Sequence, residues 1–243
     1  MSPSEIRRDA REALKGKWGK AVCIVLAFLA VSMLMGFVQG FINEESIVYT
    51  ILEVAYVIIN VPFSFGLIIS FMKIKRNEEV KTLDFIKDGF LRFGKSWGIT
   101  WHTFIRLLLP VVCLILVVIL HLVLFFTGVA VQLGTLFSLL YIVLLFTTII
   151  YIACRALLYV LAYYISFDNP ELSSKECVKK SEELMKGHRG NYFMLELSFI
   201  GWSLLAVLTL GIGMLWLTPY MQVAVVCFYE KIISKKETEK AEK

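Results

Sequence analysis

Residues 107–131 read LLLPVVCLILVVILHLVLFFTGVAV, and none of these twenty-five side chains is Asp, Glu, Lys or Arg. An apolar run of about 18 or more residues is long enough to cross the hydrocarbon core of a bilayer as an α-helix. Four further runs carry almost no charge: residues 21–42, 46–72, 133–154 and 192–229. Hydrophobic residues make up 58% of the chain, against about 45–50% in soluble domains. The sequence therefore predicts an all-α, polytopic transmembrane helix bundle.

The number of spans follows from the lengths of these runs. A single helix over residues 192–229 would be roughly 57 Å long, against a hydrocarbon core of roughly 30 Å. This run must turn back, and Leu210-Gly211-Ile212-Gly213 is the expected turn. The fourth run continues to Phe167, so its ends are not fixed by length alone. We expect six spans in total.

The basic residues predict the orientation. Segments 1–20, 73–96, 168–191 and 231–243 hold six, seven, five and five Lys and Arg residues, which is 23 of the 25 in the chain. The three intervening loops hold none. Lys and Arg concentrate in cytoplasmic loops, so we expect both termini in the cytoplasm and a multi-pass protein whose cations, with a net charge of +5, face anionic lipid headgroups. This placement argues against nucleic acid as a partner.

Three hairpins make up the predicted architecture, within one membrane domain over residues 1–243. Each begins with an amphipathic helix along the cytoplasmic interface, expected at residues 4–15, 80–93 and 174–187. The hairpins cover about 1–76, 77–167 and 168–232, and residues 233–243 are expected to form a flexible tail. Glycine-containing joints follow the amphipathic helices: ALKGKWG at 13–19, LRFGKSWG at 91–98 and LMKGHRG at 184–190. This pattern favours three parallel repeats, although any hairpin protein can carry glycine and cations there.

The same residues carry a family resemblance. The segments concerned are ALKGKWG at 13–19, Cys177–Gly190 with Ser181, Leu184, Lys186 and Gly187, LSFIGW at 197–202, LTLGIG at 208–213, Pro219-Tyr220 and Phe228-Tyr229. Together they resemble the bacterial integral membrane family called domain of unknown function 975, over nearly the whole chain. The resemblance implies a location in the bacterial plasma membrane, and it implies no activity.

Ionisable residues inside apolar runs are costly in lipid and are candidate functional residues. They are Glu53, Arg106, Arg155 and Glu196. Arg155 has apolar sequence on both sides. Either it binds a ligand, or it has a structural role, as an ion pair for which Glu196 is a candidate partner or as a donor to backbone carbonyls freed by a proline. Arg106 and Glu196 lie nearer the inner interface and could extend their charges toward it.

Prolines and glycines give further candidates. Pro62 and Pro219 lie within predicted spans and either break a helix around a binding site or only kink it. Gly36 and Gly40 form a GxxxG motif in the first span, which predicts close helix packing within the chain or between copies.

No catalytic motif occurs in the sequence, and we expect no enzymatic activity and no cofactor. Three histidines lie far apart, at 102, 121 and 188, and the five cysteines have irregular spacing, so neither a metal site nor a disulfide framework is expected. Two functions remain open. One is membrane-embedded binding or transport of a small or lipid-like ligand, which could be anionic. The alternative is a non-catalytic scaffold or regulator with a protein partner, and a lipid-modifying enzyme is a distant third.

Overall fold

The computed structural model describes residues 2–241, and within them it contains α-helices and one short 3₁₀ helix but no strand. The first half of the chain forms α1 (Pro3–Leu14), α2 (Trp18–Gln39), α3 (Ile47–Lys75), α4 (Asp84–Leu91) and α5 (Phe93–Phe126). The second half forms α6 (Val129–Ala156), η1 (Leu157–Tyr159), α7 (Ala162–Asp168), α8 (Ser174–Met185), α9 (Arg189–Leu197), α10 (Ile200–Leu208) and α11 (Met214–Ala241). The predicted all-α fold is confirmed.

Five helical segments are long and apolar enough to cross a membrane. They are Trp18–Gln39, Ile47–Lys75, Phe93–Phe126, Leu139–Asp168 and Arg189–Leu208. The sixth expected span, α11, is not among them, because polar residues such as Gln222 and Glu230 interrupt its apolar half. This half is instead the most buried part of the molecule: Val223, Ala224, Val226, Phe228 and Tyr229 have no exposed surface.

Local sequence explains how the short helices begin and end. Ser2 and Glu5 at α1, and Ser173 and Glu176 at α8, form reciprocal capping boxes, which satisfy free backbone amides at a helix start. Both helices stop at a glycine with positive φ, Gly16 at 77° and Gly187 at 84°. The middle joint differs, since Gly94 lies inside α5 and the break falls at Arg92.

The apolar faces of α1 and α8 pack inside the protein, whereas α4 buries Phe85 and Gly89 but leaves Phe90 and Leu91 exposed. Ile6, Ala10 and Leu14 of α1 are completely buried, and α1 packs mainly against α11 and also contacts α3 and α9. In α8, Cys177 and Met185 are likewise buried, against α5, α7 and η1. Helices do occur at the three positions expected from the sequence. The apolar sides of α1 and α8 meet neighbouring helices, so burial within the bundle fixes these two helices in place.

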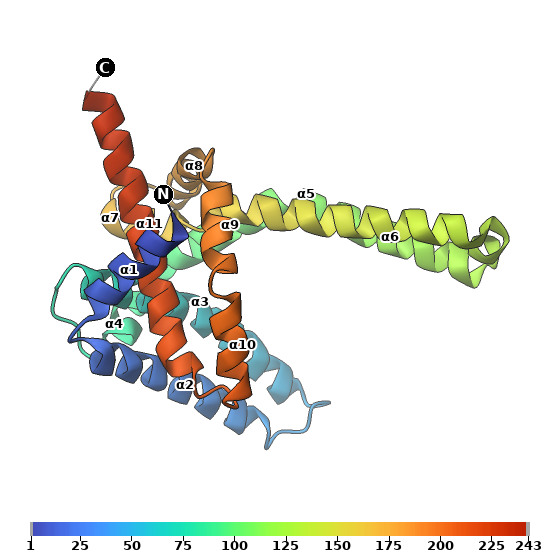
Figure 1. Ribbon diagram of the computed structural model, residues 1–243. Helices are drawn as coiled ribbons and strands as arrows, with labels where there is room; N and C mark the ends of the chain where they lie inside the picture. Colours follow the sequence, from blue (N-terminus) through green and yellow to red (C-terminus); the bar gives the residue numbers. More distant parts are fainter. Residues whose placement is uncertain (1, 242–243) are drawn as a thin grey trace.

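The helices α5 and α6 form a long hairpin that projects from the rest of the molecule (Figure 1). Gly128, with φ of 75°, precedes α6 at the tip, and Gly134, with φ of 76°, interrupts the first turns of α6. The rings of His121 and Tyr141 stack across the hairpin at 3.7 Å between centroids. The most apolar stretches of the two helices in this hairpin are not buried by the rest of the chain, as expected for helices that face lipid.

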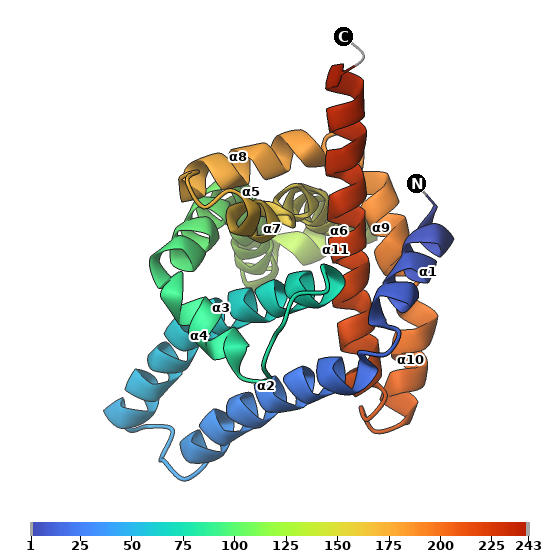
Figure 2. The ribbon, with the colours of Figure 1, turned by 90° about the vertical axis from the view of Figure 1, so that its left-hand side faces the viewer.

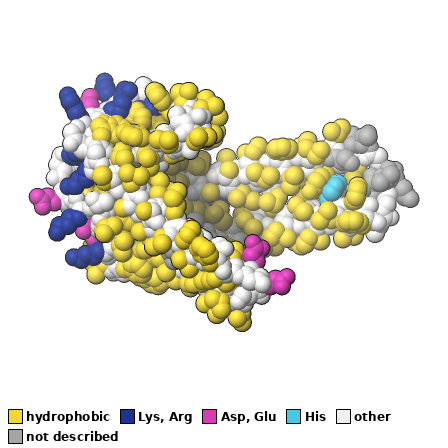
Figure 3. All heavy atoms as spheres, turned by 90° about the horizontal axis from the view of Figure 1, so that it is seen from below, with side chains coloured by type: hydrophobic (Ala, Val, Ile, Leu, Met, Phe, Trp, Pro, Cys, Tyr) yellow, Lys and Arg dark blue, Asp and Glu magenta, His cyan; other side chains and the backbone are white. Residues whose placement is uncertain are grey.

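The first half of α11 packs among other helices, and its C-terminal part projects beyond them (Figure 2). This helix contacts α1, α2, α3 and α10. Viewed from below, Lys and Arg side chains gather at the end of the molecule opposite the tip of the projecting hairpin, whose surface is largely hydrophobic (Figure 3). Cations gathered at one end and a largely hydrophobic hairpin surface fit a protein embedded in a membrane.

Three segments differ from the sequence-based expectation. The fourth apolar run is not one helix, because η1 and a turn at residues 160–161 separate α6 from α7. The fifth expected span is interrupted at Ser198 and Phe199, between α9 and α10. Residues 233–241, expected as a flexible tail, continue α11 as helix, and residues 242–243 lie outside the described part of the chain. Good helix formers such as Lys235, Lys236 and Glu237 favour this extension.

The predicted turn at residues 210–213 is present. It joins α10 to α11, and Leu210 and Gly211 adopt φ values of 55° and 85°. Gly213 has no space for a side chain, because a Cβ there would lie 2.8 Å from the Cα of Ala206. A left-handed backbone and close packing together explain why glycines occur here.

Close helix packing occurs at glycines other than the GxxxG pair. A Cβ at Gly36 would meet nothing within 4 Å, and at Gly40 it would meet only its own helix, at Phe37 and Gly36. The tight contact within the chain is between Gly66 of α3 and Gly89 of α4: a Cβ on Gly66 would lie 1.8 Å from the carbonyl oxygen of Phe85. The GxxxG motif is therefore not a packing site within this chain.

Candidate functional site

A largely apolar groove lies between α1, α10 and α11, beside the start of α2, with a volume of about 520 Å³. We call it the α1–α11 groove, and its lining residues are Ser4, Arg7, Arg11, Trp18, Trp202, Leu205, Ala206, Thr209, Gly213, Trp216, Leu217 and Tyr220. Its volume falls within the roughly 300–1,000 Å³ of small-molecule pockets.

Aromatic rings form most of the apolar wall. Trp18, Trp202 and Trp216 are three of the five tryptophans in the chain. Trp202 is 53% exposed and Trp216 is 51% exposed, so the groove is open at its side. The Tyr220 ring packs between Trp18 and Phe199, with centroids 6.3 and 5.1 Å away, and its hydroxyl donates to the Arg7 carbonyl oxygen at 3.2 Å. A side opening with aromatic walls suits a ligand that enters from the bilayer.

Two arginines on consecutive turns of α1 line the polar end of the groove. Arg7 donates from Nη1 to the carbonyl oxygen of Ser198 at 3.2 Å, at the joint between α9 and α10. Its Nε is buried and has no hydrogen-bond partner among the described residues. Neither Arg7 nor Arg11 forms an ion pair with any carboxylate in the part of the chain that the structure describes.

Five cations at this end of the molecule pair with a carboxylate from another segment: Lys73 with Asp88, Lys75 with Glu230, Arg76 with Asp168, Arg106 with Glu182 and Lys231 with Asp9. Several others, such as Lys15 and Lys20, have no carboxylate partner among the described residues. What distinguishes Arg7 and Arg11 is their position, because both unpaired guanidinium groups line the apolar α1–α11 groove. Guanidinium groups bind carboxylate and phosphate oxygens through paired, charge-assisted hydrogen bonds.

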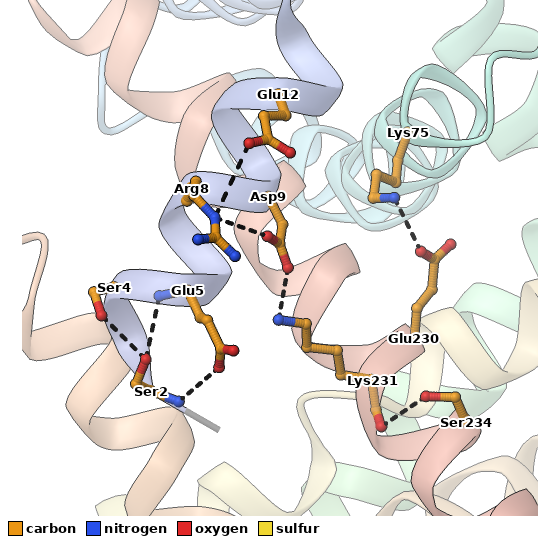
Figure 4. A network of polar contacts seen from close by, with 10 residues as sticks. All are labelled: Ser2, Ser4, Glu5, Arg8, Asp9, Glu12, Lys75, Glu230, Lys231 and Ser234. Atoms are coloured by element: carbon orange, nitrogen blue, oxygen red, sulfur yellow. Dashed lines mark hydrogen bonds and ion pairs between the residues drawn. The ribbon is translucent and has the colours of Figure 1, made fainter.

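The opposite side of α1 holds this helix in place (Figure 4). Asp9 and Lys231 of α11 form an ion pair with 2.6 Å between Oδ2 and Nζ, and Glu230 on the same helix pairs with Lys75 of α3 at 3.5 Å. Arg8 stays on the surface beside Asp9 and Glu12. As a result α1 presents paired charges on one side and unpaired arginines on the other, and it is fixed firmly enough to form one wall of a site.

A second polar centre joins the inner ends of three helices. Arg76, directly after α3, donates Nη1 and Nη2 to the two carboxylate oxygens of Asp168 at 2.6 and 2.9 Å, and Nε to Glu230 at 3.2 Å. The Tyr229 hydroxyl donates to Asp168 at 3.0 Å. The hydrogen bonds with Asp168, together with the Glu230 charge, raise the pKa of Arg76 above its ordinary value despite partial burial. Every charge here has a partner, so this centre links the helices and leaves no free charge for a ligand.

The sequence-predicted site residues do not come together. Arg106 pairs with Glu182 of α8, and its guanidinium lies 5.7 Å from the centre of the Tyr159 ring. Arg155 is half-buried, its Nε lacks a partner, and no ion pair joins it to Glu196 among the described residues. Glu196 lies near the phenols of Tyr192 and Tyr164 instead. The candidate structural pair between Arg155 and Glu196 is therefore absent.

The remaining candidates have separate surroundings. Glu53 is exposed in the outer part of α3. Pro62 is buried beside α4, where its carbonyl oxygen lies 2.1 Å from the position of a Cβ on Gly89, so it belongs to the tight α3–α4 contact. Pro219 is buried next to Tyr220, and it is the predicted residue closest in sequence to the α1–α11 groove.

Arg7, Arg11, Trp202 and Trp216 were not recognised as site residues from the sequence. Arg7 and Arg11 are part of a basic amphipathic helix, where every cation is an equal candidate. Their signal was the spacing of four residues, which places both on one side of α1, away from Asp9. That side of α1 meets α10 and α11 only in the folded protein, because these helices lie nearly 200 residues further along the chain.

A comparison with known protein families gives one match. The family described as "Protein of unknown function (DUF975)" matches residues 1–236. No curated protein and no solved structure matches the chain.

Proposed function

Because the chain belongs to the DUF975 family of proteins of unknown function, its function has to be inferred from its own geometry, and we propose that it binds an anionic membrane lipid. The phosphate group would lie against Arg7 and Arg11, and the acyl chain would lie along Trp202 and Trp216. The observation that carries the proposal is the pair of arginines without a carboxylate beside an open apolar wall.

Several features support a lipid over a water-soluble ligand. The groove opens sideways between helices that include two candidate membrane spans. Trp18 begins the first of these spans, and tryptophan concentrates at the membrane–water interface. Arg7 and Arg11 lie a few residues before it, where inner headgroups are expected. An amphipathic ligand matches the gradient from cationic to apolar along the groove.

We also infer the membrane arrangement that the groove requires. In this proposal α11 is a sixth span, and both termini lie in the cytoplasm of a bacterial cell. A helix shielded from lipid by α1, α2, α3 and α10 can include polar residues, which accounts for the modest apolarity of α11. The inner ends of α3, α7 and α11 meet at Arg76, Asp168 and Glu230, as three repeated hairpins around a common centre would.

Tryptophan quenching tests the proposal directly. The purified protein is placed in nanodiscs with lipids brominated on the acyl chain, either phosphatidylglycerol, which is anionic, or phosphatidylcholine, which is zwitterionic. We expect stronger quenching by the anionic lipid, because it concentrates at the three groove tryptophans. In the double variant Arg7→Gln with Arg11→Gln the preference should fall about tenfold or more, since hydrogen bonds to charged groups contribute about 1.5–3 kcal/mol each.

Arg8→Gln is the matched control, since Arg8 lies on the same helix and its partners are Asp9 and Glu12. This variant should keep the anionic preference of the parent. Equal quenching by both lipids in the parent, or the same preference in the double variant and the parent, would refute the proposed function.

A further inference from the structure

A second group of cationic side chains, separate from the α1–α11 groove, lies where α5, α6 and η1 meet. It consists of Arg106 on α5, Arg155 on α6 and Tyr159 on η1, and it shares no residue with the groove. Arg155 and Tyr159 are separated by about one helical turn. The guanidinium of Arg106 lies 5.7 Å from the Tyr159 ring centre.

The pairing of the two helices fixes the depth of this cluster. The stacked rings of His121 and Tyr141 set the antiparallel register, and counting back from them places Arg155 at the level of Arg106. Arg106 precedes Phe126, the last residue of α5, by twenty residues, which is about 30 Å at 1.5 Å per residue. A hydrocarbon core is also about 30 Å thick. If the hairpin tip lies at the outer edge of the hydrocarbon core, both arginines lie at the level of the inner headgroups and Arg155 is not at the bilayer centre.

The hydrogen-bonding groups of this cluster are incompletely satisfied. Arg106 has Glu182 as its partner, whereas Arg155 has no ion pair with any described residue. The Nε of Arg155 and the hydroxyl of Tyr159 are both buried without a hydrogen-bond partner, and Tyr159 is only 4% exposed. Arginine keeps its charge at ordinary pH, so two guanidiniums and one carboxylate leave a net charge of +1.

Buried donors without a hydrogen-bond partner are costly, so an acceptor is expected beside them. Glu196 does not serve, because no ion pair joins it to Arg155 among the described residues. We propose that Arg155, with Tyr159 and Arg106 beside it, binds a phosphate group at the inner membrane surface. At this depth the source is the headgroup of an inner-leaflet phospholipid. The site does not depend on the α1–α11 groove.

Counting retained lipids by native mass spectrometry tests this site separately from the groove. The protein is extracted from nanodiscs of phosphatidylcholine that contain a minor fraction of phosphatidylglycerol. The parent should retain two phosphatidylglycerol molecules. Arg155→Gln should lose one and keep the groove lipid, whereas Arg7→Gln with Arg11→Gln should lose the other. Lys179→Gln is the control, because Lys179 is a 71% exposed cation on α8, and it should retain both.

Two further measurements distinguish the possible outcomes. Arg155→Lys preserves the charge but not the paired geometry, and it should bind about tenfold more weakly than the parent while it remains folded. Titration of detergent-solubilised protein with inorganic phosphate, followed by phosphorus NMR, distinguishes a soluble ion. Binding of inorganic phosphate that depends on Arg155 supports the phosphate site and assigns it to a soluble anion. If Arg155→Gln retains as much phosphatidylglycerol and phosphate as the parent, the proposal is overturned.

Discussion

Asp168 occupies the position where the inner ends of three helices meet. Its carboxylate accepts two hydrogen bonds from Arg76 and one from Tyr229, and Arg76 also reaches Glu230. The contact is between residues 92 and 154 positions apart in the sequence. Because both Arg76 and Asp168 are mostly shielded from solvent, with 28% and 23% of their side chains exposed, removing one charge leaves the other without a partner.

Asp168→Asn should lower the stability of the folded protein by about 1–2 kcal/mol. The value follows from the loss of charge-assisted hydrogen bonds, reduced because the pair is partly exposed to solvent. Thermal unfolding in detergent measures it. Glu171→Gln is the matched control, since Glu171 is an exposed acid three residues later. Equal melting temperatures for the two variants would show that the Arg76 centre does not hold the helices together.

At the scale of elements, α4 is held by backbone contact with α3. A Cβ at Gly89 would lie 2.1 Å from the carbonyl oxygen of Pro62, and one at Gly66 would lie 1.8 Å from that of Phe85. Around this contact the rings of Phe63, Phe85 and Phe90 pack edge to face. Small residues let helices approach this closely, so the two glycines determine where the second amphipathic segment docks.

Gly89→Ala should destabilise the protein by about 1–3 kcal/mol, the usual cost of overpacking, because the backbone of α3 has to shift. Gly201→Ala is the control, since Gly201 is also helical and a Cβ there meets nothing within 4 Å. Its replacement should be neutral or add up to about 1 kcal/mol through helix propensity. Chemical denaturation of both variants in detergent compares them, and a Gly89→Ala protein as stable as Gly201→Ala would contradict the close approach.

At the scale of the whole molecule, long apolar arms extend from one charged end (Figure 3). The most apolar stretches of the projecting α5–α6 hairpin are not buried by the rest of the chain, whereas the first half of α11 is packed against other helices. Lipid therefore has to cover far more of the hairpin than of α11. We propose that the end rich in Lys and Arg lies in the cytoplasm, in line with the positive-inside rule.

Cysteine labelling tests that orientation. Glu44→Cys lies in the loop between α2 and α3, and Lys236→Cys lies in the last turns of α11. A membrane-impermeant maleimide should label only position 44 in intact cells, and both positions after permeabilisation. The parent protein gives the background from its own cysteines, of which Cys23, Cys113 and Cys154 are exposed and Cys177 and Cys227 are buried. Burial raises the pKa of Cys177, and a protonated thiol reacts slowly. Labelling of position 236 in intact cells would disprove cytoplasmic termini.

The sequence by itself determined the membrane class, most helix positions and the distribution of charge. These features depend on local composition: apolar runs of sufficient length, capping residues such as Ser2 and Ser173, and glycines where the chain turns. The capping boxes, the turn at residues 210–213 and two of the three glycine joints were predictable for this reason, since each is decided within a few neighbouring residues.

Only the tertiary structure decided which polar residues meet. A structural pair with Glu196 was one of the alternatives for Arg155, yet no ion pair joins the two among the described residues. The break at η1 and the register of the α5–α6 hairpin set their positions. Arg7 and Arg11 face the groove because α1 docks on α11, more than 200 residues along the chain. A long apolar run favours a membrane-spanning helix whatever its neighbours are. The partner of a charged side chain, by contrast, depends on residues that only folding brings near. The groove could therefore not be predicted from the sequence.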